Sequence, residues 1–360
     1  MDRHELRRLD YSLTQDHTDL QNAYREFFTT ACPIETVRAA EATGFDKRLW
    51  ERLCATGATT MALPESTGGD GATLVDLTLL AEEAGRTLAP VPWIDHVVTA
   101  RLCARLGAMN TEILSGEQIC ALDPHQDSAT GPRLLPAGSI ADQVLVRDGD
   151  QVLRIWFQNK PARVHNIGCL PMAWVDPAAA TDRHVLAHGP DAVAAYQRAL
   201  DEWRLLTAAA LTGLTDATMT IAADFAKTRY TLGVPIASLQ AISHPLADIA
   251  IVVAGARNLV RRAAWFIDNE PGERPELPSC AFVYIAGEAP KAAATAVHVQ
   301  GGLGVSTEAA ASAYLVRARG WALAGGDPAH TAQRITDLVN AREHTRQSTR
   351  GTAVAEPAAV

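Results

Sequence analysis

Two adjacent glycines, Gly301 and Gly302, follow a predicted helix near the end of this 360-residue chain. A glycine pair allows the backbone to approach a phosphate closely and to offer it N–H groups as hydrogen-bond donors. The same pair is also typical of a plain helix stop. The sequence alone therefore leaves two interpretations open, a phosphate contact and a helix end.

The six cysteines show no spacing typical of a metal site. They stand at positions 32, 54, 103, 120, 169 and 280, so no pair forms Cys-x-x-Cys and none clusters with histidines. Structural zinc sites usually draw on such pairs. We therefore expect no metal site and interpret the cysteines as reduced structural thiols of a cytosolic protein.

The charge balance argues against a nucleic-acid-binding protein. The formal net charge is −9, from 32 basic and 41 acidic residues, and the arginines are scattered, whereas phosphate backbones require clustered basic side chains. The segment from Met1 to Asp10 is charged and has no apolar core, unlike a signal peptide. The strongly apolar run near Ile249 to Ala256 is shorter than the roughly 20 residues needed to cross a bilayer. We expect a soluble, cytoplasmic protein.

The first part of the chain, residues 1–115, has a helical pattern of apolar residues. Leu13, Leu20, Ala23 and Phe27 recur at helical spacing. Glycines and prolines from Pro64 to Gly71 predict a loop, after which Thr73 to Arg86 predicts a helix that is ended by Pro90 and Pro92. We predict an N-terminal helical domain.

The middle part, residues 116–192, loses the helical period. Val144, Leu145 and Val146 lead into Asp148-Gly149, and a second β-rich run covers Val152 to Phe157. Two such runs around Asp-Gly indicate a hairpin. We predict a small middle β domain.

The last part, residues 193–345, is rich in alanine and helical again. Leu205 to Ala223 is apolar on almost every face, which predicts a helix buried inside a bundle. Further helices are expected at about Pro245 to Asp268 and Cys280 to Val299. Residues 346–360 are predicted to be a disordered tail. The whole is mainly α with a β insert, and we expect a ligand where the parts meet.

Four stretches in this order resemble the motifs of the acyl-CoA dehydrogenase family. They are Ala62 to Glu65 with Gly68 to Gly71 (ALPE and GGDG), Ala81 to Arg86 (AEEAGR), Phe225 to Ile236 (FAKTRYTLGVPI) and Val297 to Glu308 (VHVQGGLGVSTE). Gln240 and Leu246-Ala247-Asp248 also fall where the family has a glutamine and a similar "LAd" segment. The resemblance runs from about residue 12 to residue 340.

This resemblance implies the family's fold, which is an N-terminal helical domain, a middle β domain and a C-terminal four-helix bundle. It also implies FAD as cofactor and a fatty acyl or related thioester as substrate. The family positions that contact the FAD of a neighbouring subunit or its dinucleotide are matched here by Arg229, Thr231, Gln240, His298, Gly301 and Gly302. A guanidinium such as that of Arg229 fits paired phosphate oxygens. The alternative is ordinary surface polarity, and His298 replaces the usual glutamine.

The catalytic glutamate of the family has no counterpart at its commonest position. A carboxylate removes the proton α to the thioester while hydride leaves the β-carbon for the flavin. Counting forward from Arg317-Ala318-Arg319 places this position at Gly325, and counting back from Gln333-Arg334 places it at Asp327. Asp327 is thus a candidate for a relocated base.

A less common position for this glutamate precedes an arginine at the start of the buried helix. In this chain Trp203 stands there, followed by Arg204. Glu202 lies one residue earlier, which turns it by about 100° around the helix axis. Glu202 is therefore a second, displaced candidate.

The middle domain also departs from the family. The segment that holds a chain's own flavin is replaced by Ile119 to Pro124 (ICALDP), and Trp156 is followed by Phe157-Gln158-Asn159 in place of the family's "WiTng" motif. The chain thus keeps the residues that the family lends to a neighbour's FAD and lacks those that hold its own.

These features favour one subunit of a heteromeric enzyme. The chain resembles the shorter subunits of actinobacterial dehydrogenases that act on steroid side-chain CoA thioesters. This resemblance implies an α2β2 assembly with a catalytic acyl-CoA dehydrogenase partner, an acyl-CoA substrate and an electron-transfer flavoprotein as acceptor. Two alternatives remain, a homomeric enzyme with Asp327 or Glu202 as base, and a redox-silent subunit that binds a thioester or serves as a scaffold.

Overall fold

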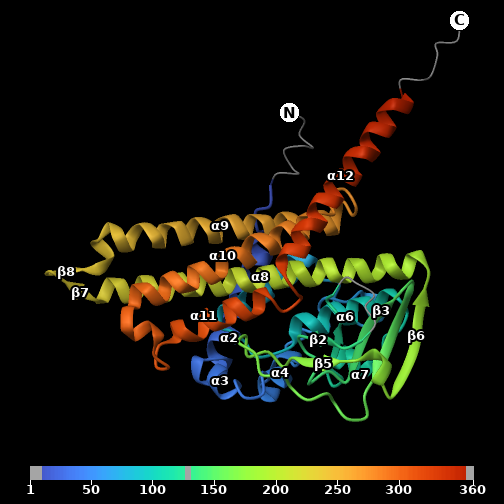
Figure 1. Ribbon diagram of the computed structural model, residues 1–360, viewed down its shortest axis with the longest axis horizontal. Helices are drawn as coiled ribbons and strands as arrows, with labels where there is room; N and C mark the ends of the chain where they lie inside the picture. Colours follow the sequence, from blue (N-terminus) through green and yellow to red (C-terminus); the bar gives the residue numbers. More distant parts are fainter. Residues whose placement is uncertain (1–9, 126–130, 354–360) are drawn as a thin grey trace, which may run out of the picture.

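A computed structural model describes residues 10–125 and 131–353, with side chains described up to residue 344. Figure 1 shows a long helical bundle on one side and a smaller region of short helices and strands on the other. Three parts follow one another along the chain, in the order helices, strands, helices. The predicted class, mainly α with a β insert, is confirmed.

The N-terminal part consists of short helices around aromatic and leucine side chains. The helices are α2 (Gln15–Ala31), α3 (Ile34–Ala39), α4 (Lys47–Cys54), α5 (Leu74–Arg86), α6 (Trp93–Arg105) and α7 (Thr111–Ser115), with the 3-10 turn η1 (Glu65–Thr67) between α4 and α5. Thr73 caps α5 and forms a reciprocal capping box with Asp76, so this helix begins where the sequence predicted. The predicted loop from Pro64 to Gly71 precedes it.

The middle part contains the predicted hairpin. Its main sheet has the order β1-β3-β4-β6, made of β1 (Cys120–Leu122), β3 (Gln143–Asp148), β4 (Gln151–Trp156) and β6 (Asp182–His188). β1 pairs with β3 in parallel, and the other pairs are antiparallel. Asp148 pairs with Gln151, and Gly149 between them has a φ of 59°, as a tight turn requires. A second sheet pairs β2 (Arg133–Leu135) with β5 (Ala173–Val175).

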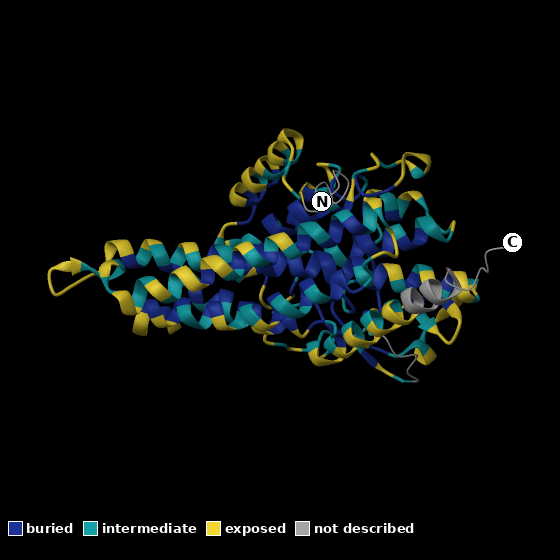
Figure 2. Ribbon diagram, turned by 90° about the horizontal axis from the view of Figure 1, so that it is seen from above, coloured by how far each residue is buried: buried dark blue, intermediate teal, exposed yellow. Residues whose placement is uncertain are grey.

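The C-terminal part is a bundle built around one very long helix. Its helices are α8 (Pro190–Thr228), α9 (Gln240–Asn269), α10 (Leu277–Gln300), α11 (Ala310–Ala322) and α12 (Pro328–Ala353), joined by the hairpin β7 (Tyr230–Thr231) and β8 (Val234–Pro235), the turn η3 (Ile236–Ser238) and the turn η4 (Gly301–Val305). Every residue of α8 from Glu202 to Thr215 is buried, which confirms the predicted buried helix. Figure 2 shows this buried stretch at the centre of the molecule.

One expectation about the C-terminal end of the chain needs correction. α12 extends to Ala353, so residues 346–353 are helical and not a disordered tail, and residues 354–360 lie outside the described part. The segment from 345 to 353 contains no proline, so nothing in its backbone prevents the helix from continuing.

α8 has the length and hydropathy to span a membrane, but 78% of its most apolar 18-residue window is buried inside the protein.

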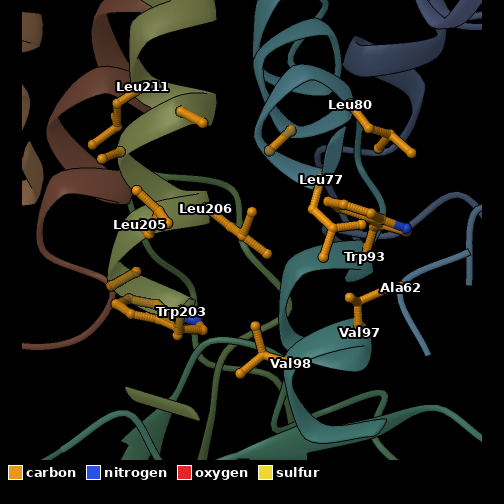
Figure 3. Close-up of a cluster of buried hydrophobic side chains, with 14 of the residues drawn as sticks. Ala62, Leu77, Leu80, Trp93, Val97, Val98, Trp203, Leu205, Leu206 and Leu211 are labelled. Atoms are coloured by element: carbon orange, nitrogen blue, oxygen red, sulfur yellow. The ribbon is translucent and has the colours of Figure 1, made fainter. Parts of the chain in front are cut away.

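The largest hydrophobic core joins the N-terminal helices to the bundle. Figure 3 shows Leu77 of α5 and Val98 of α6 on the sides of their helices that face Leu206 of α8, with Trp203 near Val98. A second, smaller core lies within the middle part. The N-terminal domain and the bundle therefore share one interior.

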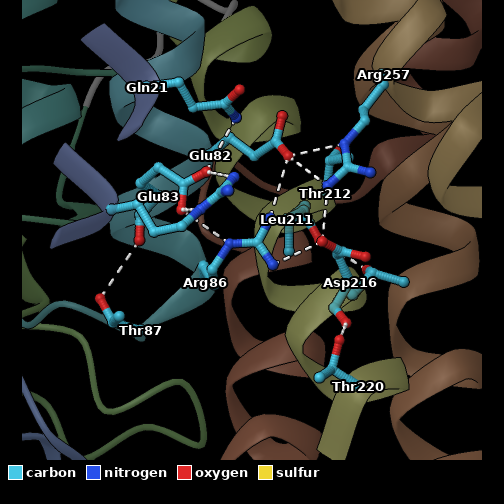
Figure 4. Close-up of polar contacts among 12 residues, drawn as sticks. Gln21, Glu82, Glu83, Arg86, Thr87, Leu211, Thr212, Asp216, Thr220 and Arg257 are labelled. Carbon is cyan, nitrogen blue, oxygen red and sulfur yellow. Dashed lines mark hydrogen bonds and ion pairs between the residues drawn. The ribbon is translucent and has the colours of Figure 1, made fainter. Parts of the chain in front are cut away.

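An ion-pair network reinforces the same boundary, and it explains the AEEAGR segment. Arg86 pairs with Glu83 at 2.8 Å and with Asp216 of α8 at 2.6 Å. Arg257 of α9 contacts both Glu82 and Asp216 at 2.7 Å. Figure 4 shows these contacts joining α5, α8 and α9. The segment that resembles a family motif thus fastens two domains together.

Candidate functional site

The residues predicted to contact FAD gather at one end of the bundle, which projects beyond the rest of the molecule (Figures 1 and 2). We call this end, formed by residues 229–240 and 298–305, the bundle tip. A small apolar cluster with Ala226 of α8, Ala296 and Val299 of α10, and Ile236 of η3 packs these segments against one another. The structure therefore brings together residues about 70 positions apart in the sequence.

All six predicted contact residues are exposed at the bundle tip. They are Arg229, Thr231, Gln240, His298, Gly301 and Gly302. Within the described part of the chain, none of their side chains forms a hydrogen bond or ion pair. Arg229 is the C-cap residue of α8, and its guanidinium is thus available to a group from outside the chain.

The backbone of the bundle tip also has features that the chain itself does not require. Gly302 has no atoms around the position that a Cβ would occupy, and it lies outside the positive-φ region, so no contact in this chain demands glycine there. Leu232 is 92% exposed and has a φ of 49°, which is strained for a residue with a side chain. Open space and an exposed apolar side chain are what a surface for a partner needs.

Gly325 and Trp203, the two positions predicted to correspond to the family's catalytic glutamate, meet inside the protein. Gly325 and Trp203 are so close that a Cβ on Gly325 would lie 2.7 Å from the Cζ3 and Cη2 atoms of the Trp203 indole. Trp203 is almost completely buried, at 4% exposure. One indole therefore fills the space where a side chain from either position would project.

Glu202 points away from this space into a cluster of arginines. Its carboxylate is fully buried and pairs with Arg101 at 2.9 Å, with Arg105, and with Arg198 at 3.5 Å. Burial alone would raise the pKa of Glu202, but the arginines outweigh burial and the pKa falls below its ordinary value. Since the helix turns by about 100° per residue, Glu202 does not face the same side as Trp203. It is an ion-paired structural group, and the proposed role as a displaced base does not fit its position.

Asp327 does not reach the interior either. It is exposed at the start of α12, where its Oδ1 accepts a hydrogen bond of 2.9 Å from the backbone N–H of Ala329. An aspartate in this position stabilises the first turn of a helix. Asp327 therefore has a helix-capping role, and a shorter side chain on the loop does not place a carboxylate near Trp203.

A loop of the middle domain closes directly on the bundle. Gly168 and Gly320 of α11 touch backbone to backbone, so a Cβ on Gly320 would overlap Gly168, and the Trp321 indole N–H donates to the Gly168 carbonyl at 3.2 Å. On its other side, the backbone from Cys169 to Pro171 contacts Gly44 of the N-terminal domain. No planar ring fits between this loop and α11 where the two glycines meet.

The segment that replaces the family's flavin-holding motif forms hydrogen bonds within the middle domain and with α8. The Oδ2 atom of Asp123 accepts a hydrogen bond of 2.6 Å from Arg133, and the Tyr196 hydroxyl of α8 donates to the Asp123 carbonyl at 2.7 Å. Trp156 ends β4, with the Arg154 guanidinium 5.6 Å from its ring centre. These residues anchor the sheet to α8 and to one another.

An apolar cavity lies where the three parts meet, and sequence reasoning missed the one carboxylate that lines it among the described residues. Asp95 of α6 lines the cavity together with Trp203, and its Oδ1 accepts a hydrogen bond of 3.0 Å from the Trp203 indole N–H. Burial raises the pKa of Asp95 to about 6. The only sequence signal was an aspartate between apolar residues in the first turn of α6, Trp93-Ile94-Asp95.

Comparisons with known proteins agree with this architecture. The models "Acyl-CoA dehydrogenase, N-terminal domain" and "Acyl-CoA dehydrogenase, C-terminal domain" match residues 14–111 and 193–339. Acyl-CoA dehydrogenase IpdE2 of Mycolicibacterium smegmatis is 30% identical over 310 residues, covering 84% of this chain and 91% of the relative.

Two solved structures share the fold over nearly their whole length. The ChsE4-ChsE5 complex from Mycobacterium tuberculosis has a TM-score of 0.78 at 25% identity, and the Tcur3481-Tcur3483 steroid ACAD G363A variant has a TM-score of 0.80 at 23% identity. Each match covers 92% of this chain and 99% of the other. The three-part arrangement and its order are thus those of the matched proteins.

Proposed function

Because this chain belongs to the acyl-CoA dehydrogenase family, we propose that it is the base-lacking subunit of a heteromeric, FAD-dependent acyl-CoA dehydrogenase. In this proposal a catalytic partner chain binds the FAD and supplies the glutamate, and this chain completes the partner's FAD site. The assembly is α2β2 with two FAD, and it catalyses α,β-dehydrogenation of an acyl-CoA thioester in the cytoplasm.

The contact between Trp203 and Gly325 carries this proposal. Dehydrogenation requires a base that removes a proton from the α-carbon of the thioester, and in this family the base is a carboxylate. Here both family positions for it are occupied by an indole and a glycine that are packed against each other, and neither Glu202 nor Asp327 lines the cavity.

The bundle tip supports the second half of the proposal. FAD is the family's cofactor and, when bound, accepts the hydride from the β-carbon of the substrate. The guanidinium of Arg229 suits two phosphate oxygens of its pyrophosphate, and Gly301 and Gly302 present an open backbone beside it. Tyr230, Leu232 and Val305 are exposed large hydrophobic residues on the same tip, as an interface with another chain requires.

The matched proteins support a proposal for the substrate class. One matched structure is described as a steroid acyl-CoA dehydrogenase and another as a complex of two different chains. We propose a CoA thioester of a steroid side chain as substrate, with an electron-transfer flavoprotein as acceptor.

Co-expression tests the proposal. The chain purified alone should be colourless, whereas co-expression with the acyl-CoA dehydrogenase encoded by an adjacent gene should give a yellow complex with one FAD per pair of chains. Arg229→Gln should lower the FAD content of the complex by tenfold or more, because one charge-assisted contact is lost. Arg48→Gln, at an exposed arginine of α4, is the matched control and should leave FAD unchanged.

Other outcomes separate the alternatives. A yellow lone chain with one FAD that oxidises an acyl-CoA supports a homomeric enzyme and contradicts the proposal. A complex that forms without any flavin supports a redox-silent binding subunit and contradicts it as well. Full FAD content in the Arg229→Gln complex would show that the bundle tip does not serve the partner's cofactor.

A further inference from the structure

A second cavity, away from the bundle tip and from Trp203, is lined by three arginines. It lies between the loop from Pro64 to Gly71, the C-terminal half of α6 and the start of α8, and its volume is about 440 Å³. This volume is within the usual range of small-molecule sites. The charged residues that line it in the described part of the chain are Arg101, Arg105 and Arg198, without any carboxylate. We call it the arginine cavity.

The loop that forms one wall of the arginine cavity is held in a fixed shape. A Cβ on Gly69 would lie 2.2 Å from the carbonyl oxygen of Leu63, so only glycine fits this close approach. The backbone N–H of Gly71 donates to the Leu63 carbonyl at 2.9 Å, and that of Ala72 donates to the Met61 carbonyl at 2.8 Å. This wall is therefore formed before any ligand arrives.

The three arginines of the cavity share a single carboxylate. Glu202 is fully buried behind them and is the ion partner of Arg101, Arg105 and Arg198. Asp268 acts on Arg101 from a longer distance and forms no ion pair with it. In the network that joins α5, α8 and α9, by contrast, three carboxylates meet three ion-paired arginines among the described residues. The cavity therefore has two positive charges without a paired anion.

Several hydrogen-bond donors around the cavity have no acceptor in the described part of the chain. The Nη1 atom of Arg105 is buried and forms no hydrogen bond. Arg198 contacts Glu202 through Nε at 3.5 Å, which leaves its two terminal nitrogens for other partners, and its side chain is 44% exposed. Burial lowers the pKa of Arg105 below its ordinary value, and the charges of Arg101 and Arg198 act in the same direction. An added anion would relieve both the missing acceptors and the repulsion.

We propose that the arginine cavity binds a small organic phosphate, with the dianionic phosphate group on Arg105 and Arg198 and the organic body on the apolar wall. A dianion supplies the two negative charges that the cluster lacks, and guanidinium groups match pairs of phosphate oxygens. Ala62, Pro64 and Ala104 provide apolar surface beside the arginines. The inference concerns the lone chain and does not rest on the proposed partner or on FAD.

Calorimetric titration of the purified full chain with phenyl phosphate tests the proposal. At pH 7.5 and low ionic strength this monoester carries nearly two negative charges, and its binding should be saturable. Phenyl sulfate has a similar shape and one negative charge, and it should bind about tenfold more weakly. Inorganic phosphate has the charge and no body, and it should bind roughly 3- to 10-fold more weakly than phenyl phosphate.

Variants test the assignment of the binding groups. Arg198→Gln should weaken phenyl phosphate binding by about tenfold or more, because one charge-assisted contact is lost. Arg198→Lys keeps the charge but not the fork of donors, so its affinity should be intermediate. Arg48→Gln, at an exposed arginine of α4, is the matched control and should bind as wild type does.

A variant of the loop keeps the proposal testable if the Arg198→Gln protein does not fold. Ser66 is exposed and lines the cavity, so Ser66→Asp should leave the fold intact while placing a carboxylate beside the arginines. This variant should also weaken phenyl phosphate binding by about tenfold, because the added negative charge repels the phosphate.

Four results would overturn the proposal. The absence of saturable binding of phenyl phosphate rules out the site, and wild-type affinity in Arg198→Gln or Ser66→Asp rules out the assigned residues. Equal affinity for phenyl sulfate contradicts the need for a dianion. Equal affinity for inorganic phosphate would make free phosphate the occupant and contradict the organic body.

The proposal can fail separately from the role proposed for the bundle tip. Arg198→Gln should leave the FAD content of the complex unchanged, and Arg229→Gln should leave the titration of the lone chain with phenyl phosphate unchanged, because the two arginines lie near opposite ends of α8. Loss of phenyl phosphate binding in the Arg229→Gln chain would show that the phosphate binds at the tip and would overturn the assignment to the arginine cavity.

Discussion

The two sides of α8 at Glu202 and Trp203 differ sharply, although the two residues are neighbours in sequence. On one side, Glu202 is surrounded by three arginines. On the other, Trp203 and Asp95 share an apolar cavity. The pKa of Glu202 is lowered and that of Asp95 is raised to about 6. The two carboxyl groups thus behave oppositely because Glu202, which is fully buried, has ion partners, whereas Asp95, which is half-buried, has none among the residues that the structure describes.

The largest effect is expected from Glu202→Gln. The change leaves Arg101, Arg105 and Arg198 without their common anion in a partly buried site, which should lower the free energy of unfolding by about 3 to 5 kcal/mol. Urea denaturation measures it, with Asp19→Asn as a control expected to stay within about 0.5 kcal/mol. A loss below 1 kcal/mol would show that the arginine cluster does not depend on this carboxylate.

Asp95→Asn should raise the free energy of unfolding at neutral pH, whereas Glu202→Gln should lower it. Because the folded pKa of Asp95 is raised to about 6, the folded state binds the proton more tightly than the unfolded chain. Stability is therefore highest below about pH 4, falls as the pH rises towards about 6, and is then constant. The variant lacks this dependence of stability on pH, and it should be more stable than wild type at pH 7.5 by roughly 2 to 3 kcal/mol.

Unfolding free energies at pH 4.5 and pH 7.5 test this expectation. The difference between the variant and wild type should be smaller at pH 4.5 than at pH 7.5. An unchanged difference at both values would mean that Asp95 does not titrate in this range, and the contrast with Glu202 would disappear.

Gly325→Ala should cost about 1 to 3 kcal/mol, because the new Cβ would overlap the Trp203 indole. The same change in a Trp203→Ala background should cost little, and the difference between the two measures the coupling of these positions. Gly287→Ala on α10 is the matched control, since no atoms surround the position of its Cβ, and it should be neutral or slightly stabilising. Equal costs in both backgrounds would contradict the packing described for the two base positions.

The smallest effect on stability is expected at the bundle tip. Arg229→Gln should change the free energy of unfolding of the lone chain by no more than about 0.5 kcal/mol, since the side chain is exposed and has no partner in the described part of the chain. Thermal unfolding of the lone chain provides the measurement. A loss above 1 kcal/mol would mean that the guanidinium serves this chain rather than a neighbour.

The sequence predicted the elements well because their signals are local. The capping pair Thr73 and Asp76, the Asp148-Gly149 turn and the continuous apolar run after Leu205 each identify an element within a few residues. The displacement of Glu202 from the base position also followed from helix geometry alone. The extension of α12 to Ala353 was missed because low hydrophobicity does not by itself end a helix.

The cavity could not be predicted in the same way. Asp95 and Trp203 are 108 positions apart, and nothing in either segment indicates that their side chains form a hydrogen bond. The backbone contact between Gly168 and Gly320 likewise depends on how the domains pack. Sequence reasoning predicted that no base stands at Gly325 and Trp203, but not that an indole from one position fills the space beside the other.

The length of α8 has a consequence for how the chain tolerates insertions and deletions. Trp203 lies on α8 and Arg229 is the residue directly after this uninterrupted helix, 26 positions further on, which corresponds to about 39 Å at the rise of an α-helix. Removing a single residue between them would shift Arg229 by about 1.5 Å and rotate it by about 100° relative to Trp203. Such a deletion would preserve the composition and apolar character of α8, yet it would misalign the cavity and the bundle tip at the same time.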